Sequence, residues 1–127
     1  MRIAVNTSCL IPNLLEGCGH FTAETFKLIT QQHPEHTFFF LFDRPYDEQF
    51  IFSKNIIPIV VNPRTHRVTF FKKWWYDLKV SAILRKIKAD VFLSTDGLCN
   101  LDTKVSQIQI IHDLAFLHFP NFIKKSH

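Results

Sequence analysis

The chain has 127 residues, of which 46% are hydrophobic and 20% charged, and its formal net charge is +4. That length predicts one domain with a sizeable core, and the composition excludes disordered, collagen-like and low-complexity proteins. The longest apolar runs, Phe38 to Phe42 and (counting Pro58) Ile56 to Val61, fall far short of the roughly 20 residues of a membrane-spanning helix.

The first residues predict a strand rather than a leader, because Met1-Arg2 runs straight into Ile3-Ala4-Val5, so no signal peptide is expected. The three cysteines are odd in number and follow no zinc or disulfide spacing, which predicts reduced thiols in a cytoplasmic protein.

The positive charge is concentrated between Arg64 and Lys88, where eight basic residues stand against one acid. That segment has a net charge of +7, so the remaining residues sum to −3. The chain is therefore predicted to be a slightly acidic domain that carries one basic element.

The amino-terminal half predicts a strand, a helix and two further strands. Arg2 to Asn6 reads as a short buried strand, and a helix follows the loop that Gly17-Cys18-Gly19 closes. That helix is expected to end at His33-Pro34, since the residue before a proline disfavours the helical region. Thr37 to Phe42 is continuously apolar, which predicts a strand buried on both faces. In Ile56 to Val61, Pro58 argues for an edge strand or one that starts late.

The second half predicts a helix from about Phe70 to Ile87, followed by strands at Val91 to Leu93 and Val105 to Ile111. The mostly βαβ order predicts an α/β fold with a Rossmann-like, mostly parallel sheet and helices on both faces. Beyond Ile111 the sequence closes no obvious element, so we expect the domain to be truncated. The apolar stripe of the helix is expected at Phe71, Trp74, Trp75, Leu78, Ala82 and Ile83.

The first candidate site is the loop Glu16-Gly17-Cys18-Gly19-His20. Glycines between a strand and its helix let backbone amides approach a ligand, and a helix amino terminus favours phosphate. The pattern is only Gly-x-Gly, with Thr22 where a dinucleotide fingerprint needs a third glycine, and only Asp43 comes near the position of a ribose-binding acid. A plain tight turn is the alternative.

The second candidate is His112-Asp113, directly after the last predicted strand. In an open parallel sheet, ligands bind beyond the carboxyl ends of strands, where a histidine can hydrogen-bond a sugar hydroxyl or a developing charge. Asp113 would orient that histidine or cap the next turn, and a loop pair without a ligand is the alternative. A metal bound by His112, Asp113 and His118 has nothing to fix its geometry, so no metal is predicted.

The third candidate is the basic helix with Lys72, Lys73, Trp74 and Trp75. Indoles and lysines together suit the interface of an anionic membrane, and the alternative is a packing helix with solvated lysines. Nucleic acid is not expected as a partner, because no binding motif accompanies the patch.

Four segments in register resemble one known family. They are Met1 to Thr7, Gly17 to Thr22, Lys88 to Ser94 and Ile110 to Phe116, and together they look like the amino-terminal domain of a GT-B glycosyltransferase of the bacterial family 4 type. The resemblance spans Met1 to about Pro120. It implies two Rossmann-like domains that face a cleft, the first holding a glycan or lipid-linked acceptor and the second the nucleotide-sugar donor. Transfer with retention and without a cofactor or metal is implied.

The resemblance also assigns roles to residues. Gly17 and Gly19 match the glycine loop that approaches the donor phosphates and the acceptor, and His112 matches the histidine beside the transferred sugar, with Asp113 supporting it. Cys18 and His20 depart from the family, which more often has an aliphatic residue and a basic one there. A protonated His20 would partly replace that basic side chain at the phosphates.

The family's donor domain, with its paired glutamates, lies beyond residue 127, so we expect the chain alone to be inactive and to associate with itself through exposed apolar surface. The resemblance implies a cytoplasmic protein that handles surface polysaccharide or lipid-linked sugar, with peripheral contact at the inner membrane face. The rival hypothesis is a non-enzymatic α/β module that binds a small phosphate ligand at the glycine loop.

Overall fold

The computed structural model describes residues 1–61 and 75–118, and within them the side chains of Trp75, Tyr76 and Phe116 are not described. Its centre is a five-stranded, all-parallel sheet with the strand order β3-β2-β1-β4-β5. The predicted α/β fold with a Rossmann-like parallel sheet is confirmed. The strands are β1 (Arg2–Asn6), β2 (Thr37–Phe42), β3 (Ile56–Val60), β4 (Val91–Ser94) and β5 (Ser106–Gln109).

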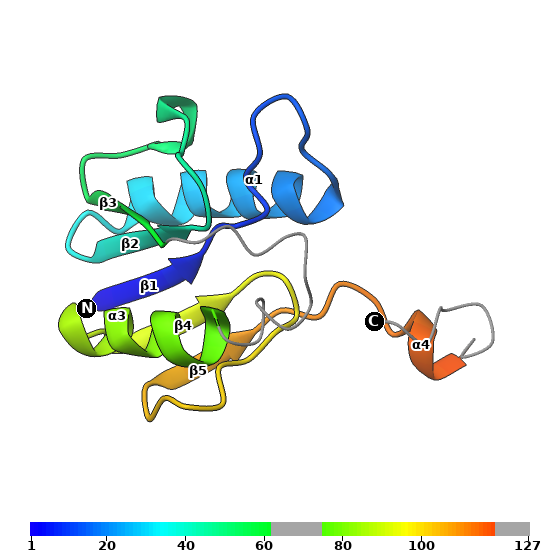
Figure 1. Ribbon diagram of the computed structural model, residues 1–127. Coiled ribbons are helices and arrows are strands. Elements are labelled where there is room, and N and C mark those ends of the chain that lie inside the picture. Colours follow the sequence, from blue (N-terminus) through cyan, green and yellow to red (C-terminus); the bar gives the residue numbers. More distant parts are fainter. Residues whose placement is uncertain (62–74, 119–127) are drawn as a thin grey trace.

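Helices cover both faces of the sheet (Figure 1), as the sequence predicts. The strand β2 shows why: Phe38, Phe40 and Phe42 pack with Phe26 of α1 (Gly17–Gln32), whereas Phe39 and Leu41 pack against the opposite helix. Successive side chains of a strand point to opposite faces, so a continuously apolar strand is one buried on both sides. Five of the six residues of β2 are buried, and Thr37 is half-buried.

The helix α1 begins in the glycine loop itself and ends one residue before His33. The amide of His33 closes the helix by donating to the carbonyl of Ile29 at 3.0 Å. The stop at His33-Pro34 is therefore confirmed, and the helix amino terminus includes both glycines of the first candidate site. The strand β3 lies at the sheet edge, which is the first of the two positions that Pro58 predicts.

The second predicted helix is described from Trp75 onward, as a π-helical stretch η2 (Trp75–Val80) followed by α3 (Ser81–Lys86). The predicted stripe is wrong at two positions of this part: Leu78 is 50% exposed and Ala82 is exposed, while Val80 and Leu84 are fully buried. At Ile83 it is confirmed, since this side chain is partly buried against the core. A π-helix has more residues per turn than an α-helix, so a stripe extrapolated at a period of 3.6 arrives on the wrong face.

The strand β5 forms the second edge of the sheet and is shorter than predicted. Ile108 on it is 54% exposed, and Ile111 just beyond it is 56% exposed. The short helix α4 (Ala115–His118) follows, with Leu117 63% exposed. A short 3-10 helix, η1 (Glu48–Phe50), lies between β2 and β3. The loop 95–105 joins β4 to β5 without a helix. The exposed apolar side chains that the sequence predicts are therefore present along β5 and α4. Self-association of the chain through them stays a prediction.

Candidate functional site

The carboxyl ends of the strands bring the first two candidate segments to one edge of the sheet. Because β1, β4 and β5 run parallel, the loops after them emerge together, next to the amino terminus of α1 (Figure 1). A cavity of about 350 Å³ lies there, lined by Asp96, Gly97, Gln109, Ile111, His112 and Asp113. The structure therefore places His112 and Asp113 in the crevice that an open parallel sheet offers to ligands.

His112 is joined to two neighbouring elements. Its Nε2 atom lies 2.7 Å from the carbonyl oxygen of Thr95, and its ring meets Phe21 of α1 edge-on, with ring centroids 5.3 Å apart. A carbonyl oxygen only accepts hydrogen bonds, so Nε2 carries a proton and donates it. In the neutral ring this leaves Nδ1 as an acceptor for a ligand hydroxyl.

Thr95 is the central residue of this edge, and the sequence analysis does not single it out. Its carbonyl accepts from both His112 and the thiol of Cys18, the latter at 3.0 Å. Its buried hydroxyl donates to the carbonyl of Asn6 at the end of β1, at 2.8 Å. Thr95 thus ties the ends of β1 and β4, the glycine loop and the histidine together. A threonine directly after a buried strand is the signal that could have indicated it.

Asp113 caps a turn rather than orienting His112. Its carboxylate accepts from the backbone amide of Ala115 at 3.0 Å, at the start of α4. Of the two roles that the sequence leaves open for this aspartate, the structure shows the cap.

The two glycines of the loop have different surroundings. A methyl group on Gly19 would lie 2.8 Å from the carbonyl oxygen of Cys9 and 2.9 Å from Leu15, whereas one on Gly17 would meet nothing within 4 Å. Gly19 therefore allows the loop after β1 to pack against the helix. Gly17 faces open space and leaves room for an incoming ligand. His20 is exposed on the first turn, and its amide donates to Glu16 at 2.9 Å.

The amino terminus of α1 has the electrostatics of an anion site. No side chain caps it, and its first turn contains no acidic residue, so its first backbone amides face the loop with the positive end of the helix dipole. Glu16 stands at the capping position without a side-chain hydrogen bond to the helix. Its exposed carboxylate opposes an anion, as do the carboxylates of Asp96 and Asp113, which line the neighbouring cavity.

Two further polar groups near this edge are not suited to ligand chemistry. Burial and, to a smaller extent, the neighbouring Cys9 raise the pKa of the Cys18 thiol to about 12, so Cys18 is protonated at neutral pH and is a poor nucleophile. Asp43, the residue closest to a ribose-binding acid, has both carboxylate oxygens on Arg44, at 2.6 and 2.9 Å. That ion pair occupies the carboxylate.

The basic helix can be followed only in part. Lys72, Lys73 and Trp74 lie outside the described residues, and of Trp75 only the backbone is described, as the first residue of η2. The membrane hypothesis therefore stays a prediction. Among the helices in the described ranges, none is long and apolar enough to cross a membrane.

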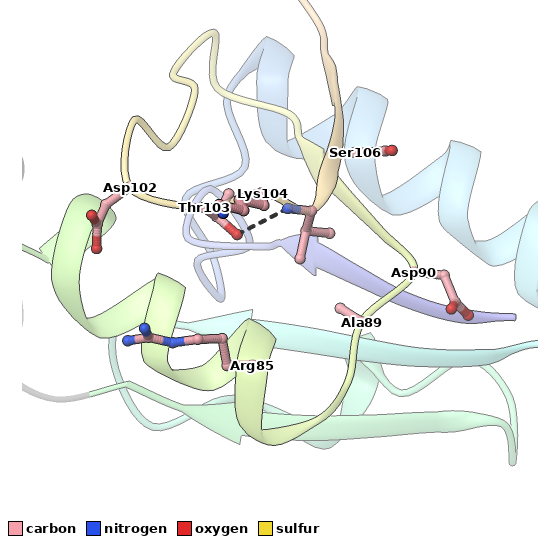
Figure 2. Close-up of a pocket in the computed structure, with 8 residues that line it drawn as sticks. Arg85, Ala89, Asp90, Asp102, Thr103, Lys104 and Ser106 are labelled. Carbon is pink, nitrogen blue, oxygen red and sulfur yellow. Dashed lines mark hydrogen bonds between the residues drawn. The ribbon is translucent and has the colours of Figure 1, made fainter.

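A second and larger cavity, of about 540 Å³, lies at the opposite edge between α3 and the start of β5 (Figure 2). Figure 2 shows its polar side chains spread around it rather than directed at one point, and Asp90 is already bonded to the amide of Arg2 at 2.6 Å. We therefore favour the smaller cavity, where the strand ends converge. Within residues 1–61 and 75–118, His112, Asp113 and His118 do not form a cluster with metal-ligand geometry.

Comparisons with known proteins return no match for this chain: no family model matches it, and no significant match is found among the curated proteins or the solved structures. The fold class thus rests on the structure itself. The resemblance of the four segments to a glycosyltransferase stays a prediction.

Proposed function

We propose that this chain is the amino-terminal, acceptor-side part of a retaining glycosyltransferase that moves a sugar from a nucleotide sugar to a glycan or lipid-linked acceptor. The observation that carries the proposal is the link through Thr95, whose carbonyl is bonded to both Cys18 of the glycine loop and His112. Two segments of the resemblance, about 90 residues apart in the sequence, are thus joined through one residue, and His112 of the second segment lines the smaller cavity.

The residues of this edge suit the proposed chemistry. His112, held by Thr95 and Phe21, would present Nδ1 to a hydroxyl of the transferred sugar. The uncapped start of α1 would stabilise negative charge on the departing diphosphate, and the open space at Gly17 would admit its oxygen atoms. Asp113 would act indirectly, by fixing the turn after the histidine.

The chain alone is expected to be inactive, because a transferase stabilises the departing diphosphate with groups from two domains. The uncovered apolar side chains along β5 and α4 support an incomplete assembly. Turnover of a nucleotide sugar by the purified chain of 127 residues would contradict this part of the proposal.

The first test is to sequence the reading frame past the codon for His127. We expect roughly 200 more codons, enough for a second domain of ordinary size, with a Rossmann-like pattern and paired glutamates. In that longer enzyme His112→Ala is expected to lower kcat by roughly 100-fold or more, while His118→Ala, on the exposed α4, leaves it unchanged. A stop codon directly after His127, or equal kcat in both variants, would refute the transferase proposal.

The uncapped amino terminus of α1 also favours the second candidate function, a non-enzymatic module for a small phosphate ligand. The two functions differ in what the chain does alone. A module binds inorganic phosphate or a mononucleotide without any further domain, and Gly17→Val weakens that binding by placing a branched side chain in the open space. Titration of the chain with both ligands by isothermal calorimetry separates the two hypotheses.

A further inference from the structure

A cluster of metal-ligating side chains lies at the other end of the molecule from the candidate site. The turn between α1 and β2 has the sequence His33-Pro34-Glu35-His36 and stands at the amino-terminal edge of the sheet (Figure 1). Its location is independent of the function proposed above. The sequence analysis predicts no metal and does not consider these residues together.

The distances in this cluster are close to those of a metal site. Oε1 of Glu35 lies 3.0 Å from Nδ1 of His33 and 3.6 Å from Nε2 of His36. The three residues each offer one ligand atom, and these atoms all lie within 4.8 Å of one another. In a tetrahedral zinc site with bonds of about 2.0–2.2 Å, neighbouring ligand atoms are about 3.4 Å apart. Small side-chain rotations would therefore close the site.

The backbone of the turn is already fixed. The amide of His36 donates to the carbonyl of His33 at 3.2 Å, and the side-chain amide of Asn55 contacts three backbone carbonyls, those of Thr30, His33 and His36, at 3.0–3.1 Å. The two imidazole rings are stacked, with centroids 5.6 Å apart and planes inclined by 12°. Binding would not have to order the chain, which removes a large part of the usual entropic penalty.

The charges and the exposure also suit a cation. The carboxylate of Glu35 lies 3.0 Å from the His33 ring nitrogen and 3.6 Å from that of His36, and a carboxylate offers a cation a negatively charged oxygen ligand. The side chains of His33 and Glu35 are 51% and 57% exposed, which leaves a coordination position for water. An exposed ion pair of this kind contributes little to stability, so the arrangement is not explained as a stabilising salt bridge.

We propose that His33, Glu35 and His36 bind a single divalent transition-metal ion, with Zn²⁺ as the best fit. Two imidazoles and one carboxylate favour zinc over magnesium or calcium, which take oxygen ligands. The bound ion would join the end of α1 to the start of β2. On the far side of His36, the amino group of Met1 donates to Nδ1 at 3.3 Å, so in the metal-free chain the neutral ring carries its proton on Nε2, and metal binding displaces that proton.

The test is a calorimetric titration of the tag-free chain with ZnCl₂ at pH 7.5 in a buffer that does not chelate metals. We expect one ion per chain with a dissociation constant on the order of 10 μM or tighter. The double variant His33→Gln/His36→Gln should bind at least roughly tenfold more weakly, since the loss of even indirect ligand support costs 10–100-fold. Excess Mg²⁺ should not compete.

Matched controls keep the test specific. His112→Gln and His118→Gln remove exposed histidines from the opposite edge, and Cys99→Ser removes the exposed thiol, so all three should bind Zn²⁺ within about twofold of the parent chain. Because the substituted histidines lie on a surface turn, thermal unfolding without metal should be unchanged in the double variant. A parent chain that does not bind Zn²⁺, or a double variant that loses less than tenfold, would overturn the proposal.

Discussion

The two glycines of the α1 loop provide the sharpest test of the structure, because they share a helix turn and differ in their surroundings. In Gly19→Ala the added methyl group would lie 2.8 Å from the carbonyl oxygen of Cys9, and that oxygen belongs to the backbone. A backbone atom cannot rotate away as a side chain can, so the loop or the helix must shift. In Gly17→Ala the methyl group meets nothing within 4 Å.

The expected magnitudes follow from this difference. Overpacking of a tight contact costs about 1–3 kcal/mol, so Gly19→Ala should lower the free energy of unfolding by that amount. Gly17→Ala should leave it unchanged or raise it by up to about 1 kcal/mol, because alanine restricts the unfolded chain and suits a helix. For a domain of this size, 1 kcal/mol corresponds to roughly 3–6 °C in Tm.

Urea and thermal unfolding, followed by circular dichroism, measure both variants against the parent chain. Gly17→Ala should be as stable as the parent chain or more stable, and Gly19→Ala should be clearly less stable than the parent chain. If Gly19→Ala is as stable as Gly17→Ala, the close approach of the Cys9 carbonyl to the helix is incorrect. The assignment of Gly19 as the glycine that allows the loop after β1 to pack against α1 would then lose its basis.

Three further predictions concern single side chains. Thr95→Val keeps the shape but removes the buried hydroxyl that bonds Asn6, so it should destabilise the chain by about 1–3 kcal/mol in a urea titration, with Thr95→Ser recovering part of the loss. Iodoacetamide at pH 8 should label Cys99 before Cys18, because a pKa of about 12 leaves Cys18 roughly 1,000-fold less thiolate than an ordinary thiol. The labelling rate of Cys18 should increase as the pH rises. Equal labelling rates at pH 8, measured by mass spectrometry over time, would contradict the burial of the Cys18 thiol. Asn55→Ala removes an amide that contacts three backbone carbonyls and should lower Tm by several degrees, whereas an unchanged Tm would show that the turn before β2 is held by other contacts.

The location of the two candidate segments in the fold could be predicted from the sequence, because one strong local rule applies, and their function stays a prediction. The strand before His112-Asp113 and the helix after the glycines place both segments at the carboxyl edge of a parallel sheet, and a cavity lies there. The role of Asp113 could not be chosen, because orienting His112 and capping a turn need the same residue at the same position. Thr95 could not be identified at all, since its importance lies in contacts to residues far away in the sequence.

The sequence by itself determined the α/β class, the five strands, the end of α1 before Pro34 and the burial of β2 on both faces, because each of these depends on local apolar periodicity or on proline. Only the tertiary structure decided the strand order, the face that Val80 and Leu84 bury, and the different surroundings of Gly17 and Gly19. It also brought His33, Glu35 and His36 into one cluster. The strand order, the surroundings of the glycines and the histidine cluster depend on distances between atoms that are far apart in the sequence. The buried face of the second helix depends on the π-helical period of η2. The spacing of residues along the chain predicts neither quantity.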